Sequence, residues 1–404
     1  MTSLFDQNRH EPLIKREWNI DEAVQEINQI VHDFSSDFDL NNGCWPTHPL
    51  DAASYPRKGP KWCLYGGAAG AVVGLSILRS EGYVAPDLSS QLPSIYSAYL
   101  KNPDVNLELG LQLGEIGILT PTVLSNPENE ELSNRLVQCM KQIIGHPSRE
   151  ITSGETGMMH AALALYRATS QEKWKEHFLK GAESLLSSWE YHTDCGKWLW
   201  TNDIFGYTRR HYGACHGIVG NANVLFKGAD LIPVDHNEII IERVASALTS
   251  SALRGSDMVN WHAGAPPNEG LLLVQWCHGA PGIATALGST PEVDTKSSEI
   301  LNHLILEAGR LTWYAGPLKK GSGICHGTAG NGYAFLSLFK RTGNQQWLDY
   351  ARNFAMHAIE QCRTDRQKYG QSRYTLWTGD AGLAIYLHHC IFPEKAAIPG
   401  LEIF

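Results

Sequence analysis

Three short pieces of the sequence place a cysteine and a histidine side by side, directly before a glycine. The pieces are Ala214-Cys215-His216-Gly217, Trp276-Cys277-His278-Gly279 and Ile324-Cys325-His326-Gly327. Thiolate and imidazole groups are the ligands that zinc and other borderline metals prefer, and a catalytic zinc site uses three protein ligands while keeping a fourth position open. The pieces supply six candidate ligands, and spacing alone does not choose three. Alternatively, the small cysteines pack at tight turns and the histidines bond backbone groups.

These pieces belong to a longer series of G-x-x-G elements. Seven copies are spaced by 47, 40, 63, 62, 48 and 52 residues and begin at Gly67, Gly114, Gly154, Gly217, Gly279, Gly327 and Gly379. Recurrence at this near-regular spacing predicts an internal repeat. Because each Cys-His pair occupies the same place in its copy, the repeat should bring the three pairs to one end of the fold.

The segments around the glycines have the composition of paired helices. The runs that follow them, such as Met158–Tyr166 and Asn331–Phe339, are almost free of charge and predict buried inner helices. In the second copy, Thr120–Pro121 predicts an early stop or kink. The segments with a helical period and a charged face, which predict outer helices, are Glu130–Ile144, Gln171–Trp189, Glu238–Leu253, Ser297–Arg310 and Gln345–Arg363. Seven such pairs closed into a ring form an all-α (α/α)7 toroid.

Composition narrows the functional classes. The chain has 404 residues, of which 33 are basic and 42 acidic, and its net charge of −9 argues against a general nucleic-acid binder. The apolar stretches are too short to span a bilayer, and the N-terminus lacks the apolar core of a secretory signal. The odd number of cysteines, nine, favours reduced thiols in the cytoplasm. We expect one toroid domain over residues 1–404, with an N-terminal extension over about residues 1–20.

Two pieces of the sequence resemble the lanthionine synthetase C-like (LanC-like) proteins. They are Gln275–Ile283, which reads QWCHGAPGI, and Lys319–Leu336, which reads KKGSGICHGTAGNGYAFL. The resemblance extends at lower specificity over all seven repeats. It is closer to the eukaryotic-type branch, which binds glutathione, than to the lantibiotic cyclases. The resemblance implies an (α/α)7 toroid with a central zinc ion.

The resemblance also implies roles for particular residues. Cys277, Cys325 and His326 match the zinc ligands. His216 matches the histidine proposed as acid or base in the cyclases. Lys320 matches a lysine near the bound thiol substrate in the eukaryotic-type branch.

Other positions match the family less closely. His278 stands where the cyclases tend to carry tyrosine, and it would act as a donor beside the metal or as a further acid or base. The catalytic aspartate of the cyclases falls near Glu150. Their arginine four residues before the first zinc cysteine is replaced by Leu273. Arg9 is the candidate counterpart of an N-terminal arginine that contacts glutathione.

The implied chemistry is the addition of a thiol to a dehydroamino acid. A zinc ion held by two thiolates and one imidazole leaves a position for a substrate thiol and lowers the pKa of that thiol. The thiolate would attack the β-carbon of dehydroalanine or dehydrobutyrine, and His216 would protonate the α-carbon of the resulting enolate. Lys320 would stabilise the enolate or hold a carboxylate of glutathione.

The segment Trp189–Tyr212 is rich in aromatic residues and carries Arg209 and Arg210 near its end. It predicts either an outer helix and loop that pack by aromatic stacking or a rim that grips a peptide. If the substrate carries phosphoserine or phosphothreonine, these two arginines are natural phosphate ligands during elimination.

The leading hypothesis is therefore a zinc enzyme that adds a thiol to dehydroamino acids in a peptide or protein, with glutathione as the expected thiol. A second hypothesis is a zinc- and glutathione-binding regulatory protein without turnover, and a third is a cyclase acting on a dedicated precursor peptide. A metal-free glycosidase with Glu155 and Asp380 as its carboxylates would leave the Cys-His copies unexplained. These hypotheses give Cys215 no role of its own.

Overall fold

Each of the seven G-x-x-G elements begins an inner helix. The computed structural model describes residues 4–52, 59–106, 108–204, 206–266 and 270–404. The first glycine of every element lies directly before a helix, and these inner helices are α3 (Ala68–Ser80), α5 (Glu115–Ser125), α7 (Glu155–Thr169), α9 (Ile218–Lys227), α11 (Ala280–Leu287), α13 (Thr328–Thr342) and α15 (Asp380–Ile391). Most of their residues are buried, as their uncharged sequences predicted.

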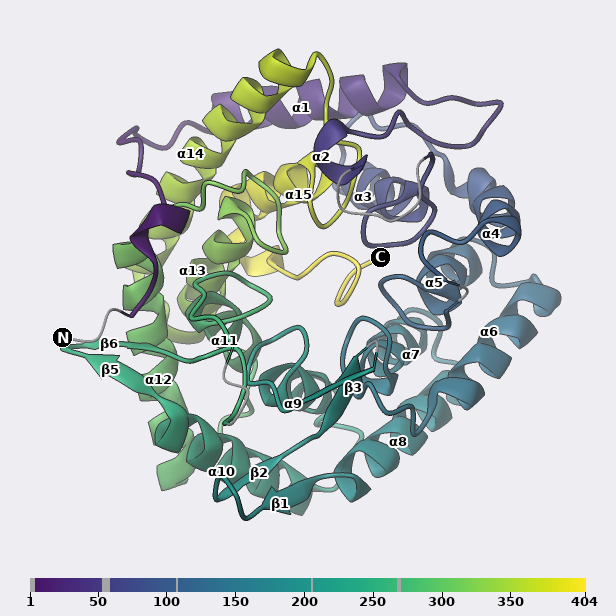
Figure 1. The fold of residues 1–404 in the computed structure, drawn as a ribbon. Helices are drawn as coiled ribbons and strands as arrows, with labels where there is room; N and C mark the ends of the chain where they lie inside the picture. The colour runs from purple at the N-terminus through teal and green to yellow at the C-terminus, as the bar shows by residue number, and fades with distance from the viewer. Residues whose placement is uncertain (1–3, 53–58, 107, 205, 267–269) are drawn as a thin grey trace.

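Seven amphipathic helices surround the inner ones (Figure 1). They are α1 (Ile20–Ser36), α4 (Leu92–Lys101), α6 (Glu130–Ile143), α8 (Glu172–Ser187), α10 (Val234–Ser251), α12 (Lys296–Ala315) and α14 (Gln345–Tyr369). Six of them pack on the inner helix that precedes them in the chain, whereas α1 packs on α15, the last inner helix. The two ends of the chain thus complete the seventh pair, and the all-α (α/α)7 toroid is confirmed.

The turns before the inner helices are joined in a closed circle of backbone hydrogen bonds. In each turn the residue two positions before the first glycine takes part in this circle. The backbone N–H of this residue, or of the residue before it, donates a hydrogen bond of 2.9–3.4 Å to a backbone carbonyl of the next turn. The donor and acceptor residues are, in order, Tyr65 to Gln112, Gln112 to Thr152, Ile151 to Cys215, Cys215 to Cys277, Cys277 to Cys325, Cys325 to Trp377, and Trp377 to Tyr65.

The second glycine of each element is required by close packing. A Cβ at any of these seven positions would overlap the carbonyl oxygen six residues earlier. A Cβ on Gly70, in the first repeat, would also touch Leu376 of the last repeat. The repeated glycines therefore allow adjacent turns to approach, and the ring closes at this contact.

Two local predictions about helices were wrong. Helix α5 continues to Ser125, four residues beyond Pro121, so the proline does not stop it. The region between α8 and α9 forms two antiparallel hairpins instead of an extended outer helix: β1 (Glu190–His192) with β2 (Lys197–Leu199), and β3 (Asn202–Ile204) with β4 (Tyr207–Arg209). Its aromatic residues do stack, since the Trp189 and Trp200 ring centroids lie 4.0 Å apart.

The remaining elements are short. They are α2 (Pro49–Ala52), a hairpin of β5 (Leu253–Gly255) and β6 (Met258–Asn260), and the 3-10 helices η1 (Gln7–Arg9), η2 (Ser89–Gln91) and η3 (Pro393–Lys395). Within the described ranges, no helix is both long and apolar enough to cross a membrane.

Both terminal segments pack against the ring. The N-terminal segment runs beside the turn before α13, where the carbonyl of Arg9 accepts a hydrogen bond from the Lys319 N–H at 3.0 Å. The C-terminal segment turns into the middle of the ring (Figure 1). There Leu401 is buried, and Glu402 pairs with Lys227 of α9 at 2.6 Å. The described part of the expected extension, from residue 4 onward, therefore packs on the toroid.

Candidate active site

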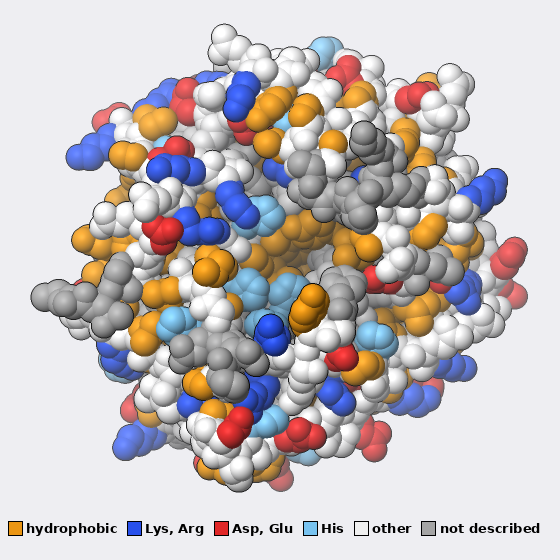
Figure 2. Space-filling view, in the orientation of Figure 1, with side chains coloured by type: hydrophobic (Ala, Val, Ile, Leu, Met, Phe, Trp, Pro, Cys, Tyr) orange, Lys and Arg blue, Asp and Glu red, His pale blue; other side chains and the backbone are white. Residues whose placement is uncertain are grey.

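The three Cys-His pairs lie on consecutive turns of the hydrogen-bonded circle, before α9, α11 and α13. Figure 2 shows a hollow at the centre of the ring, with histidine and basic side chains around its edge. Cys215, Cys277 and Cys325 are buried, between 6% and 9% exposed. The prediction that the repeat brings the three pairs together at one end is confirmed.

Cys277 and Cys325 form a hydrogen-bonded pair of thiols. The bond from Cys325 is the main reason why the pKa of Cys277 is lowered to about 7, and the same bond raises the pKa of Cys325. The side-chain amide of Gln275 also donates to the Cys277 sulfur at 2.9 Å. Of the two thiols, Cys277 is thus the one that loses its proton more readily.

His326 follows Cys325 directly and is half-buried. Burial, with the nearby charges of Lys320 and Arg373, lowers its pKa to about 4. Its imidazole makes no hydrogen bond to another residue of the described part of the chain. Two buried thiols in contact and a neutral imidazole beside them are a donor set that suits zinc.

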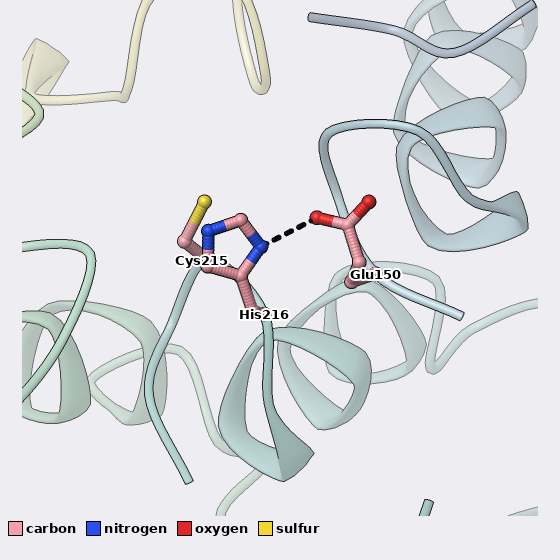
Figure 3. A group of neighbouring side chains, drawn as sticks. All are labelled: Glu150, Cys215 and His216. Carbon is pink, nitrogen blue, oxygen red and sulfur yellow. Dashed lines mark hydrogen bonds and ion pairs between the residues drawn. The ribbon is translucent and has the colours of Figure 1, made fainter. Parts of the chain in front are cut away.

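A second constellation lies on the neighbouring turns and consists of Glu150, Cys215 and His216 (Figure 3). The potential metal-ligating atoms of these residues all lie within 4.8 Å of one another. Among the described residues, this is the group of three whose ligating atoms lie that close together. The ligating atoms of Cys277, Cys325 and His326 do not all lie within 4.8 Å of one another. The sequence suggested His216 and Glu150 as acid–base residues and left Cys215 without a role.

The side chains of His216 and Glu150 form an ion pair. Nδ1 of His216 lies 2.7 Å from Oε2 of Glu150, which is fully buried. Burial alone would raise the pKa of Glu150, but bonds from His216 and from the Ser153 and Thr152 amides, at 2.5 and 2.8 Å, bring it below its usual range. Burial would lower the pKa of His216, yet Cys215 and Glu150 outweigh it and raise that pKa well above its usual range. His216 remains 24% exposed, so a reactant can reach it.

Two further imidazoles lie beside His216. The rings of His278 and His211 lie 5.4 and 5.9 Å from it, centroid to centroid, and 5.6 Å from each other. Burial, reinforced by repulsion from His216, lowers the pKa of His278 to about 3 and that of His211 to about 4. The site thus combines one charged imidazole with two neutral ones.

The candidate basic residues differ in their partners. Lys320 is exposed, and its charge acts on both Cys277 and His326. Arg209 lies near His211, and its guanidinium donates to the Thr208 carbonyl at 3.0 Å. The guanidinium of Arg210 makes two bonds of 2.7 Å to the carboxylate of Asp194 and a third to a backbone carbonyl. Arg209 is therefore the freer of the two arginines.

Sequence reasoning missed two side chains that contact the thiols. Gln275 was inside the recognised motif, two residues before Cys277, but its bond to sulfur was not predicted. It also accepts a hydrogen bond from Arg9 at 3.1 Å, which links the N-terminal segment to the site. Tyr65 contacts the Cys325 thiol from the first repeat. Its position in the circle, equivalent to those of the cysteines, was the available signal.

The carboxylates of the glycosidase alternative are engaged in their own turns. Glu155 accepts a hydrogen bond from the Gly145 N–H at 2.7 Å, and Asp380 accepts one from the Arg373 N–H at 2.8 Å. Each of these carboxylates thus ties a turn to the start of its inner helix.

Comparison with known proteins identifies relatives of the chain. The family model described as "Lanthionine synthetase C-like protein" matches residues 61–403. "Glutathione S-transferase LANCL1" of Danio rerio is 26% identical over 68% of this chain and 68% of its own length. "LanC-like protein GCL1" of Arabidopsis thaliana is 31% identical over 48% of this chain and 44% of its own length. Among solved structures, "Nisin cyclase" superposes with a TM-score of 0.62 at 13% identity, over 91% of this chain and 94% of that one, and so shares the fold.

Proposed function

The chain belongs to the lanthionine synthetase C-like family, and we propose that it is a zinc-dependent enzyme that adds a thiol to dehydroalanine or dehydrobutyrine residues of a peptide or protein. The two relatives named above come from eukaryotes, in agreement with the branch indicated by the sequence. The observation that carries the proposal is the pair of buried thiols, Cys277 and Cys325, next to the ion pair of His216 and Glu150.

In this proposal Cys277, Cys325 and His326 hold the zinc ion. The two thiols are in hydrogen-bonding contact, and the imidazole is kept neutral, which is its metal-binding form. Bound zinc would supply a Lewis acid that keeps a substrate thiol in its nucleophilic form at neutral pH. Gln275 donates to the Cys277 sulfur and stabilises its negative charge.

His216 supplies the proton in the proposed reaction. Addition forms a carbon–sulfur bond at the β-carbon and moves the double-bond electrons onto the carbonyl, which gives an enolate. One proton, equivalent to the one lost by the thiol, must then reach the α-carbon. His216 is charged, partly exposed and oriented by Glu150, as a general acid must be.

Glutathione is the proposed thiol. It carries two carboxylates, and basic side chains lie near the zinc ligands: Arg9 and Lys320 both act on the charge state of His326. Lys320 would hold a carboxylate or stabilise the enolate. One relative is named a glutathione S-transferase, which favours the same substrate.

A phosphorylated peptide would engage Arg209. If the enzyme itself eliminates phosphate from phosphoserine or phosphothreonine, Arg209 is the better ligand because Asp194 already occupies Arg210. All nine cysteines are free thiols, which suits the cytoplasmic location that we propose.

The test is to incubate the zinc-loaded chain with glutathione and a dehydroalanine peptide and to detect the thioether by mass spectrometry. We expect the wild type to form the adduct and His216→Ala to lose it while still binding glutathione. Binding of glutathione without adduct in the wild type would instead support the regulatory alternative. A peptide that carries its own cysteine distinguishes the third hypothesis, because a cyclase would close the ring without glutathione.

A further inference from the structure

A second cavity opens beside the turn that carries Glu150. Its volume is about 410 Å³, within the range of cavities that hold small ligands. Apolar side chains of Leu109, Ile143 and Ile204 line it together with the carboxylates of Glu108 and Asp203. These residues come from the turn before α5, the end of α6 and the β3–β4 hairpin.

The cavity is connected to the His216 site by a short series of hydrogen bonds. His216 bonds Glu150 at 2.7 Å, Glu150 accepts the Ser153 N–H at 2.5 Å, and the Ser153 hydroxyl donates to Glu108 at 3.0 Å. Ser153 itself lines the cavity. A peptide residue in the cavity would therefore lie a few extended residues from a group reacting at His216, since each spans about 3.3–3.6 Å.

The β3–β4 hairpin joins the two places from the other side. Asp203, at the cavity, donates its backbone N–H to the Pro147 carbonyl at 2.9 Å, which fixes the hairpin on the turn. The same hairpin ends at Arg209, near His211 of the central site. Both the turn and the hairpin that line the cavity thus also carry groups of the central site.

The charge of the cavity is negative. Among the described residues that line it, none is lysine or arginine, and His146 is the one basic type present. The Glu108 carboxylate is half-buried, with the Ser153 hydroxyl as its hydrogen-bond donor, and the charge of Glu150 opposes its ionisation. A cation bound here would therefore gain two carboxylate partners, Glu108 and Asp203, and would offset the repulsion between Glu108 and Glu150.

We propose that this cavity is a subsite for a lysine or arginine side chain of the peptide substrate, located a few residues from the dehydroamino acid. The apolar wall would contact the methylene stem, and Glu108 and Asp203 would bind the charged end. This inference rests on the proposed action on peptides, and it predicts a sequence preference that the zinc chemistry does not require.

The test uses unreactive peptides that carry alanine at the reacting position, bound to the zinc-loaded full chain and measured by fluorescence anisotropy. Lysine, norleucine or glutamate is placed in turn at each of the four positions on either side. At one or two positions we expect lysine to bind about tenfold more tightly than norleucine, and glutamate more weakly than either. In Glu108→Gln and in Asp203→Asn the preference for lysine should fall severalfold, and in the double variant it should vanish.

Glu128→Gln is the matched control, because this exposed carboxylate lies in the loop between α5 and α6, outside the cavity. It should keep the full preference for lysine. Equal binding of lysine and norleucine peptides at every position would overturn the subsite, as would a preference that survives in the double variant. The proposed function is tested separately: failure of every dehydroalanine peptide to form an adduct would overturn that function, while the binding preference would still be measurable.

Discussion

Two arcs of the same ring differ in what their turns present to its centre. The Cys-His arc, formed by the turns before α9, α11 and α13, presents Cys215, Cys277 and Cys325, each followed by histidine. The opposite arc, formed by the turns before α3, α5, α7 and α15, has in the equivalent positions Tyr65, Gln112, Thr152 and Trp377. The backbone circle is continuous through both, so the scaffold fixes positions and the side chains alone decide where chemistry is possible.

The two arcs meet where Glu150 pairs with His216. Glu150 comes from the opposite arc and is held by the amides of its own turn, whereas His216 belongs to the Cys-His arc. The opposite arc thus supplies the carboxylate that orients the His216 ring and raises the pKa of that imidazole. Three predictions test this division and a fourth tests a buried histidine of the opposite arc, in decreasing order of expected effect.

Loss of a thiol from the Cys-His arc should have the largest effect. We expect about one zinc per wild-type chain, and almost none in Cys277→Ala or Cys325→Ala, because a site with two ligands holds zinc poorly. Cys215→Ala should keep its zinc. Elemental analysis measures the zinc content of the purified wild type and of each of the three variants. Zinc that is lost in Cys215→Ala and kept in Cys325→Ala would place the metal at the group of Glu150, Cys215 and His216 instead.

Glu150→Gln tests the junction of the arcs. Without the carboxylate, His216 loses the partner that raises its pKa and fixes its ring, so adduct formation at saturating substrate should fall about a hundredfold. The zinc content should not change. The pH dependence of the remaining rate is the distinguishing measurement, since a lower pKa of His216 should move the loss of activity to lower pH. An unchanged profile would show that Glu150 has only a packing role.

The variants Gln275→Leu and Gln112→Leu compare two buried glutamines, Gln275 in the Cys-His arc and Gln112 in the opposite arc. Gln275 bonds the Cys277 sulfur, whereas neither amide atom of Gln112 finds a partner in the described part of the chain. We expect Gln275→Leu to weaken zinc binding about tenfold to a hundredfold, measured by competition with a chelator. Gln112→Leu is the control and should leave zinc affinity unchanged. Equal affinities in the two variants would remove the proposed role of Gln275.

His160 of α7 should give the smallest effect. It is 2% exposed, and burial lowers its pKa to about 4 from a usual value of 6.5. The unfolded chain therefore binds more protons between these values, so this contribution to stability is fully present above about pH 6.5 and is lost as the pH falls towards 4. From pH 7 to pH 5 the loss is about 1–2 kcal/mol. In urea unfolding, His160→Leu should lose that much less stability than the wild type over the same interval.

Much of the fold could be predicted because glycine leaves a clear signal. All seven G-x-x-G elements begin inner helices, since the second glycine is needed wherever a carbonyl lies against the helix start. Pro121 gave a misleading signal, because α5 continues through it. The pairing of α1 with α15 has no local signal, since it joins the two ends of the chain.

The residue types of the site could be predicted from the sequence, but the side chains that contact those residues could be predicted less well. The Cys-His copies and their place in the repeat indicated one cluster, and the structure brings Cys277 and Cys325 into contact. The approach of Arg9 to Gln275 and the contact of Tyr65 with the Cys325 thiol join segments that are distant in sequence. No periodicity encodes such contacts.

The sequence by itself determined the repeat, the inner helix starts and the three Cys-His pairs, because each depends on a few adjacent residues. The tertiary structure alone decided which groups became charged. Packing of the adjacent turns before α7 and α9 brings the buried Glu150 to His216 and raises the pKa of that imidazole, whereas His278 is buried without a carboxylate and its pKa falls to about 3. The two residues are identical in sequence context, Cys-His-Gly, and they differ because burial and charge act through space.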